Sequence, residues 1–484
     1  MKDFIKKQLS DFDNNSMMRL FKILISASLL VIVYGLIFSG FQIVDEFEHL
    51  HASFLVSQGK LPYRDFFEHH HPLLWYVSAP IVGLFFDNVA IFYIMRVFSF
   101  LASIGILFYL YKISLFFTNK IGGLAVIAFY LCNIITAYNF YQFRPDVFMN
   151  LFFGMGIYYW FCHIKDKKLK PLIISFSCFG VSVLFLQKIG LLLIVIEALL
   201  LWLIFTKRMK LKDIIIAAIF PCILLLVLVM FFATQNAFVE YFALNFRFNN
   251  ALVYYFDRGA FWYPNICKTI YALGLLVGLY FYKRENIYFK IITILYCAEF
   301  IMRGFYFAPH PNYYTLLIAL YSLIIATILP KTFNTNKLLS IIIILGLFYG
   351  LGLVFNRIAA TSEKSNSFEH YKMAKFIHNN SNKDDIIMNG FDKNFNIYRK
   401  DASYYWFGLD MLIPVMEQEF GIKNLVDVNT TILNNTPKFI YTKNHVDLRA
   451  LRMYGEAKYS QVYNPNLLNK YYKKTPYEYL FELK

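Results

Sequence analysis

The stretch that decides the fold is DEFEHLHASFLVSQGKLPYRDFFEHHHP, residues 45–72, which follows the first long hydrophobic segment of the chain. It contains five acidic residues and five histidines, whereas the 484-residue chain is 58% hydrophobic and only 16% charged. Carboxylates and imidazoles gathered at a membrane border indicate chemistry, because an ordinary loop needs polarity but not so many ionisable groups. A solvated interfacial loop with a helix on the bilayer explains the composition about equally well.

Outward from this stretch, long apolar runs place the chain among polytopic α-helical membrane proteins. A helix needs about 20 apolar residues to cross the hydrocarbon, and such runs predict about eleven transmembrane helices. They begin near residues 21, 90, 121, 146, 171, 189, 213, 264, 288, 312 and 338. The apolar run 72–86 is too short to cross comfortably, so we expect an interfacial or re-entrant helix there.

The net charge of +16 is informative by position. Lysines and arginines fall in short clusters between apolar spans, a pattern typical of cytoplasmic loops and not of a nucleic-acid-binding surface. A cytoplasmic N-terminus puts all these clusters on one side, and residues 45–72 and the C-terminal tail on the other. We therefore expect a multi-pass cell-membrane protein with no nucleic-acid partner.

The composition changes near residue 361, where apolar runs stop and charged residues, Asn and Tyr take over. SFEHYKMAKFIHNN has helical spacing, DIIMNG and KFIYT are typical of short buried strands, and residues 404–420 form another candidate helix. The sequence thus predicts three parts. They are a cytoplasmic segment 1–20, a transmembrane domain 21–356 whose first outer loop is 41–89, and an extracytoplasmic α/β domain 361–484.

Two acidic positions are candidates for chemistry. Asp45 and Glu46 are adjacent carboxylates at the mouth of a hydrophobic protein, where one of them suits a general base for a hydroxyl, although interface solvation also explains them. Asp146 lies in the short outer turn FRPDVF. An Asp before a hydrophobic run is a common helix N-cap, and for Asp146 alone this structural interpretation is favoured roughly two to one.

Basic and imidazole groups supply the other candidates. The consecutive His69, His70 and His71 suggest a metal, but neighbours on one backbone rarely converge on one ion, and donation to a lipid phosphate fits at least as well. Arg96 and Lys188 have no evident local partner, so we expect them to face a cavity or ligand. The remaining pair, Glu299 with Arg303 at i, i+4 spacing, is expected to neutralise itself.

These residues resemble a known family. The order of motifs looks like that of the glycosyltransferase family 39 branch of the GT-C superfamily. A first span is followed by the pair DE, by GKLPYRDFFEHHHPL (59–73) and by an arginine early in the next span. That branch includes protein O-mannosyltransferases and the aminoarabinose transferases of lipid A. Further similarities are RPD (144–146), FLQK (185–188) and HPNYYTLLIAL (310–320). The resemblance covers residues 20–356.

The resemblance implies a GT-C fold and inverting transfer of a sugar from a polyprenyl-phosphate carrier to an acceptor hydroxyl at the outer face of the bilayer. It implies Asp45 as general base, with Glu46 beside it and Asp146 as the second acidic residue. Many members have a lysine-proline pair where this chain has His71 and Pro72. The donor phosphate is therefore assigned to His69, His71, Arg96 and Lys188. Substrate contacts are expected from Arg64, Arg144, Arg303, His310 and Tyr313.

This chemistry needs few groups, because a polyprenyl phosphate leaves readily once cations hold its charge. We therefore expect no required cofactor and assign no metal ligands; a divalent metal has only weak support. The main alternative is a transporter or flippase of lipid-linked sugars, although the paired inverted halves with Gly or Pro breaks typical of transporters are not visible. A non-catalytic surface protein leaves the charged loop unexplained.

Overall fold

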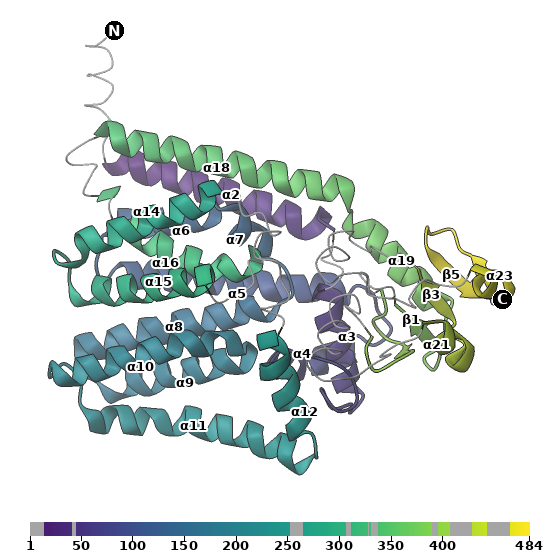
Figure 1. Cartoon of the computed structure of the whole chain (residues 1–484). Helices are drawn as coiled ribbons and strands as arrows, with labels where there is room; N and C mark the ends of the chain where they lie inside the picture. Colours follow the sequence, from purple (N-terminus) through teal and green to yellow (C-terminus); the bar gives the residue numbers. More distant parts are fainter. Residues whose placement is uncertain are drawn as a thin grey trace, which may run out of the picture. The chain divides into compact units, whose positions relative to one another are not determined.

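The computed structural model describes residues 14–40, 45–251, 265–305, 311–327, 329–330, 337–389, 395–406, 428–442 and 465–484 (Figure 1). Its contacts divide the chain into two compact units. The helical unit comprises Met1–Ile37, Val97–Val227 and Phe261–Thr361, and the loop-and-tail unit comprises Phe38–Arg96, Leu228–Ala260 and Ser362–Lys484.

The apolar runs predicted to span the membrane coincide with helices. These are α2 (Asn14–Phe38), α5 (Ile91–Ser114), α6 (Lys120–Leu131), α8 (Pro145–Asp166), α9 (Leu169–Phe185), α10 (Gly190–Phe205), α11 (Leu211–Thr234), α14 (Asn265–Tyr282), α15 (Ile287–Phe305), α16 (Thr315–Ile325) and α18 (Lys337–Lys364). Among the described residues, six helical segments are long and apolar enough to cross a membrane: α2, α5, α8, α11, α18 and Gln187–Phe205. The chain is therefore a helical multi-span membrane protein, while the number of eleven crossings stays a prediction.

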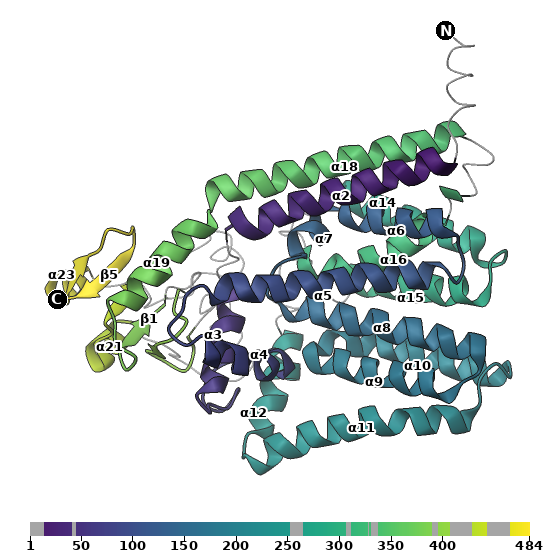
Figure 2. The same ribbon diagram turned by 180° about the vertical axis from the view of Figure 1, so that it is seen from behind.

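Close helix packing in the helical unit depends on small residues. Figures 1 and 2 show α8 and α9 side by side. A Cβ atom on Gly156 of α8 would lie 2.4 Å from Cε1 of Phe179 on α9, so only glycine fits there. The Ser175 hydroxyl of α9 donates a 2.7 Å hydrogen bond to the Gly156 carbonyl. Small and hydroxylated residues at this contact let two apolar helices approach closely, as is usual in membranes.

The loop-and-tail unit begins with two helices that flank the histidine run. Helix α3 (Asp45–Ser57) covers the first half of the acidic stretch, and α4 (Leu73–Leu84) covers the short apolar run, so the prediction of a helix there is confirmed. The Ser53 and Ser78 hydroxyls lie 2.6 Å apart and join the two helices. The middle of the chain adds two short elements to this unit: a helix, α12 (Phe238–Phe242), and a π-helical turn, Ala243–Phe248.

The tail contributes a small mixed sheet to the same unit. Its strand order is β2-β1-β3-β5-β4, with β1 parallel to β2 and β3, and β5 antiparallel to β3 and β4. The strands are β1 (Ile386–Met388), β2 (Lys400–Asp401), β3 (Phe439–Tyr441), β4 (Tyr472–Lys474) and β5 (Leu480–Leu483), and the helices are α19 (Ser367–Asn379), α21 (Val428–Asn435) and α23 (Pro465–Tyr471). The predicted strands in DIIMNG and KFIYT and the predicted helix in SFEHYKMAKFIHNN are confirmed. The candidate helix at 404–420 lies, beyond Trp406, outside the described residues.

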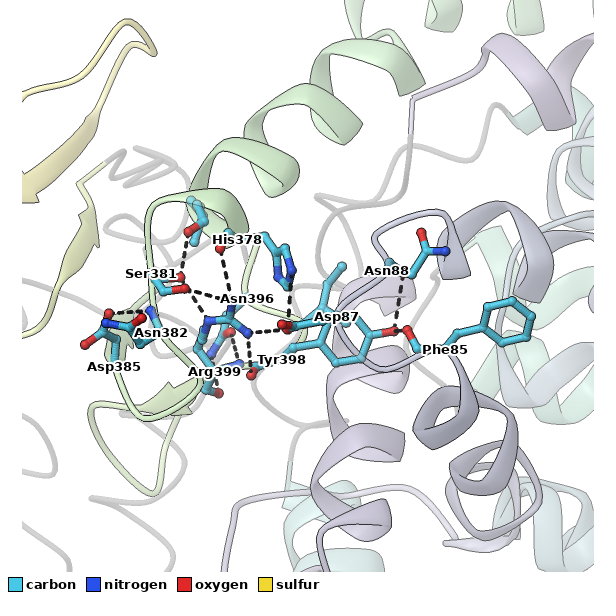
Figure 3. A network of polar contacts seen from close by, with 12 residues as sticks. Phe85, Asp87, Asn88, His378, Ser381, Asn382, Asp385, Asn396, Tyr398 and Arg399 are labelled. Atoms are coloured by element: carbon cyan, nitrogen blue, oxygen red, sulfur yellow. Dashed lines mark hydrogen bonds and ion pairs between the residues drawn. The ribbon is translucent and has the colours of Figure 1, made fainter.

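Polar contacts join the tail to the loop around α3 and α4. Figure 3 shows Arg399 of the tail donating a 2.7 Å hydrogen bond to the Asp87 carboxylate, and the Tyr398 hydroxyl donating to the Phe85 carbonyl at 2.8 Å. His51 of α3 lies 2.6 Å from the Asp401 carboxylate. These contacts fix the tail to the loop, and the predicted division of the chain into three parts stays a prediction.

Candidate functional site

The first turn of α3 carries the predicted general base. Asp45, Glu46 and Glu48 all lie in this turn, where negative charge is favoured by the exposed N–H groups of the helix. Asp45 is half-buried, whereas Glu46 is 1% exposed. Successive side chains on a helix diverge by about 100°, so the two carboxylates serve different surroundings.

Glu46 is held by Arg96. The Arg96 guanidinium donates to both carboxylate oxygens, from Nε at 2.8 Å and from Nη2 at 2.6 Å. It also donates to the carbonyls of Ser39 at 2.8 Å and Gly40 at 3.1 Å. Arg96 itself is 1% exposed, so this is a buried, bidentate pair of the strong kind. Of the acidic pair, Asp45 is therefore the carboxylate that keeps exposed surface.

The three histidines before α4 take separate positions. His71 is buried, and its Nε2 lies 3.2 Å from the hydroxyl of Tyr241. Burial raises the pKa of Tyr241 to about 12, so at neutral pH the hydroxyl keeps its proton and can donate it to His71. The His69 carbonyl accepts a 2.6 Å hydrogen bond from the Asn249 side chain. The loop is thus fixed to the segment around α12 on both sides of His70.

His70 faces two carboxylates. Its Nδ1 lies 3.3 Å from Glu48 and 3.9 Å from Glu68. Burial raises the pKa of the Glu68 carboxyl well above its usual value, although contact with Glu48 and with the His69 N–H opposes the shift. Glu48, Glu68, His69 and His70 each offer a ligand atom, and these atoms all lie within 4.8 Å of one another. They are the described group best suited to hold a metal.

Arg64 is exposed on the same unit. Its guanidinium donates to the Asp65 carboxylate at 2.8 and 3.1 Å and to the Gln235 carbonyl at 3.1 Å. The Arg64 guanidinium accordingly lowers the pKa of Asp65. Its accessibility is compatible with substrate contact, which stays a prediction.

In the helical unit, Arg144 and Asp146 stand at the start of α8. The N-cap position is Arg144, without a side-chain cap, and Pro145 is the first helical residue. The N-cap interpretation of Asp146 is therefore wrong, because the helix begins two residues earlier than that interpretation requires. Instead, Nη2 of Arg144 lies 3.3 Å from Asp146 Oδ2, and both side chains are buried.

A small cavity of about 10 Å³ adjoins this pair. It is lined by Arg144 and Asp146 together with the polar side chains of Ser103, Thr136, Asn139, Asn150 and Thr315. The Asn150 amide donates a 2.9 Å hydrogen bond to the Thr315 hydroxyl, which joins α8 to α16 beside the cavity. A cavity of this size has room for about one water molecule beside the Asp146 carboxylate.

Lys188, Arg303 and Tyr313 converge in the same unit. The Lys188 ammonium lies 3.6 Å from the centre of the Tyr313 ring, and the Arg303 guanidinium lies 5.9 Å from it. Arg303 is also paired with Glu299 at 2.6 Å, which confirms the predicted i, i+4 pair. Glu299 balances the charge of Arg303, so Lys188 is the cation beside Tyr313 that is better placed to meet an anion.

The structure thus divides the predicted residues into two groups, one per unit. Asp45, Glu46, Arg96, His69 and His71 lie in the loop-and-tail unit. The second group is Arg144, Asp146, Lys188, Arg303 and Tyr313 in the helical unit. His310 lies outside the described residues. Sequence reasoning missed Glu48, although its position three residues after Asp45 places it on nearly the same helix face; it also missed Tyr241, for which no local signal exists.

Comparison with known proteins gives one family and several similar folds. Residues 69–234 match a family model described as dolichyl-phosphate-mannose-protein mannosyltransferase, which confirms the predicted resemblance over that segment. The apo-state crystal structure of ArnT from Cupriavidus metallidurans matches at 13% identity with a TM-score of 0.59, covering 89% of this chain and 94% of that one. The archaeal oligosaccharyltransferase AglB from Archaeoglobus fulgidus, in complex with an inhibitory peptide and a dolichol-phosphate, matches at 11% identity with a TM-score of 0.52, covering 97% and 74%. No curated protein sequence matches.

Proposed function

We propose that this chain, which carries the mannosyltransferase family segment and a fold like that of ArnT, is a membrane glycosyltransferase. It moves a sugar from a polyprenyl-phosphate carrier to an acceptor hydroxyl at the outer face of the membrane. The observation that carries the proposal is the acidic pair of α3. Glu46 is fixed in a buried pair with Arg96, while Asp45 keeps exposed surface at the helix start.

The proposed reaction is an inverting displacement at the anomeric carbon. The acceptor oxygen forms the new bond to that carbon while Asp45 takes its proton as general base. The bond from the same carbon to the phosphate oxygen breaks on the opposite face, and the polyprenyl phosphate leaves with the electron pair. Attack from one face and departure from the other invert the configuration.

Cationic groups are needed to hold the departing phosphate, because preorganised charge at the leaving group lowers the barrier. In the helical unit we propose Lys188 for this task, with Arg303 beside the same Tyr313 ring. In the loop-and-tail unit His69, His71 and Arg96 remain proposals for donor contact. Arg96 is the weakest of them, because four hydrogen bonds already commit its guanidinium to Glu46, Ser39 and Gly40.

The partners that follow are a lipid-linked sugar and an acceptor that bears a hydroxyl. AglB in its solved complex holds a dolichol-phosphate, a lipid of the class proposed here. Arg64, Arg144 and Asp146 are proposed for substrate contact, since Arg64 is exposed and the other two line the small cavity. The alternative of a carrier for lipid-linked sugars shares these partners and differs in one respect, because a carrier breaks no glycosidic bond.

The test is Asp45→Asn, which keeps the size of the side chain and removes its basicity. The experiment follows the release of free polyprenyl phosphate from synthetic lipid-linked sugars when an acceptor is present. A transferase should lose about 100- to 10,000-fold in turnover and still bind the donor. The matched control is Asp384→Asn, since Asp384 is an exposed carboxylate that pairs with exposed Lys400 at 3.0 Å.

Two outcomes contradict the proposal. One is a wild-type protein that releases no polyprenyl phosphate from any plausible donor, which favours the carrier. The other is an Asp45→Asn protein that folds with unchanged stability and keeps full activity, which removes Asp45 as the base.

A further inference from the structure

Four ionisable side chains meet beside the start of α3, and three of them, Glu48, Glu68 and His70, take no part in the proposed reaction. Glu48 comes from α3, and Glu68, His69 and His70 come from the loop that precedes α4. One ligand atom from each lies within 4.8 Å of the other three. Glu48 is 1% exposed and Glu68 is fully buried, so two carboxylates share a volume from which water is largely removed.

Such an arrangement needs either a proton on one carboxyl or a positive charge, because a buried carboxylate is costly unless it is paired or protonated. Glu68 Oε1 is buried and has no hydrogen-bond partner among the described residues. Its other oxygen accepts a 3.3 Å hydrogen bond from the His69 N–H. A protonated His70 is one source of charge, at 3.3 Å from Glu48 and 3.9 Å from Glu68. A metal ion is the other.

We propose that Glu48, Glu68, His69 and His70 form a binding site for a divalent transition-metal ion of the Zn²⁺ type. Two imidazole nitrogens with two carboxylate oxygens make a donor set that zinc prefers, whereas Mg²⁺ and Ca²⁺ prefer oxygen alone. Zinc bonds of about 2.0–2.2 Å bring tetrahedral donors to roughly 3.3 Å from one another. The four ligand atoms now lie within 4.8 Å of one another. Side-chain rotations that move these atoms by about 1–1.5 Å bring them to the spacing that zinc requires.

The local fold explains how neighbouring histidines serve one ion. Consecutive residues rarely converge on a metal by themselves, but here α3 supplies Glu48 from across the loop. His71 is turned away to the Tyr241 hydroxyl and is not a member of the group. A bound ion ties α3 to the loop before α4. Because Glu48 follows Asp45 by three residues, the ion also fixes the helical turn that carries Asp45. The site does not depend on the proposed transferase activity.

The test measures metal binding directly, with full-length protein in detergent and an affinity tag that contains no histidine. The protein is stripped with a chelator, given Zn²⁺, Mn²⁺ or Mg²⁺, and analysed by elemental mass spectrometry and competition with a chromophoric chelator. We expect about one Zn²⁺ per chain and a rise in Tm on adding it. Glu68→Gln and His70→Asn should each weaken binding at least about 100-fold, since even an outer-shell change costs 10- to 100-fold.

Matched controls are available next to the site and elsewhere on the unit. His71→Asn alters the adjacent imidazole, and Glu240→Gln alters an exposed carboxylate; both should retain zinc. X-ray absorption of the zinc-loaded wild type should show imidazole and oxygen ligands, which keeps the proposal testable even if a variant fails to fold. Wild-type protein that takes up no zinc, zinc without imidazole ligation, or binding that survives both Glu68→Gln and His70→Asn would falsify the proposal and leave protonated His70 as the source of charge.

Discussion

Replacing Arg96 with methionine removes the guanidinium that holds Glu46 and keeps an unbranched side chain. Two hydrogen bonds to a charged carboxylate are lost, at 2.8 and 2.6 Å, and each is worth roughly 1.5–3 kcal/mol. Removing one partner of a buried ion pair costs about 3–5 kcal/mol, because the other charge stays buried. The loss estimated from the hydrogen bonds thus agrees with the cost of breaking a buried ion pair. Either is a large share of the free energy of unfolding of a typical domain, which is about 5–15 kcal/mol.

Two further variants separate the charge from the packing. Glu46→Gln leaves Arg96 with the Ser39 and Gly40 carbonyls, so we expect a smaller loss of about 1.5–3 kcal/mol. The double variant Glu46→Met with Arg96→Met removes both charges, and such replacements are often neutral or stabilising. The double variant should therefore be more stable than Arg96→Met alone, which gives a large coupling energy in the double-mutant cycle.

Hydrogen exchange of the α3 amides, followed by mass spectrometry, is the assay. A loss of about 3–5 kcal/mol corresponds to exchange roughly 100- to 4,000-fold faster. Arg64→Met is the control, because Arg64 is exposed and surface ion pairs of this kind contribute little to stability. The reasoning is refuted if Arg96→Met leaves α3 exchange unchanged while the KM for the lipid donor rises. That result assigns Arg96 to the donor phosphate instead of to Glu46.

Other measurements test the remaining proposals. Burial, together with the Arg399 guanidinium, lowers the pKa of His378, so folding favours its neutral form; the Tm should fall as the pH drops below about 6.5, and His378→Asn should flatten that dependence. An unchanged slope in the variant contradicts this assignment. A cysteine placed at Lys167 should resist an impermeant thiol reagent in intact cells, and labelling there overturns the predicted orientation. Lys188→Gln should raise the KM for the lipid donor by about 10- to 150-fold, because a charge-assisted contact beside Tyr313 is lost; an unaltered KM removes Lys188 from the donor site.

Local patterns predicted most of the helices and part of the tail. Apolar runs of sufficient length became helices because a membrane span must satisfy its backbone hydrogen bonds internally. The strands in DIIMNG and KFIYT were predictable from short apolar segments, and both are buried in the sheet. At Asp146 two local preferences compete, that of Asp for the N-cap and that of Pro for the first helical position. Proline is favoured at the first helical position, so Pro145 moved the cap back to Arg144, a signal that was visible in the sequence.

The convergence of distant side chains was not predictable from local patterns. The sequence around Lys188 does not indicate that its ammonium lies over the Tyr313 ring. The sequence around His71 likewise does not indicate its contact with Tyr241, 170 residues away. The histidine run was weighed as a metal site from its own spacing alone. Its suitability depends on Glu48, which α3 brings from 20 residues earlier, so only the fold makes the group visible.

The contact between Asp87 and Arg399 joins positions that are 312 residues apart. At synthesis rates of about 5–20 residues per second, roughly 15–60 seconds pass between the emergence of the first and of the second. During that time the segment around α3 and α4 exists without the strand that carries Asp401 and without the guanidinium that binds Asp87. The histidine-rich loop is therefore made early and completed last. A chain cut short before the tail carries the candidate base, Asp45, without the tail residues that bind this loop.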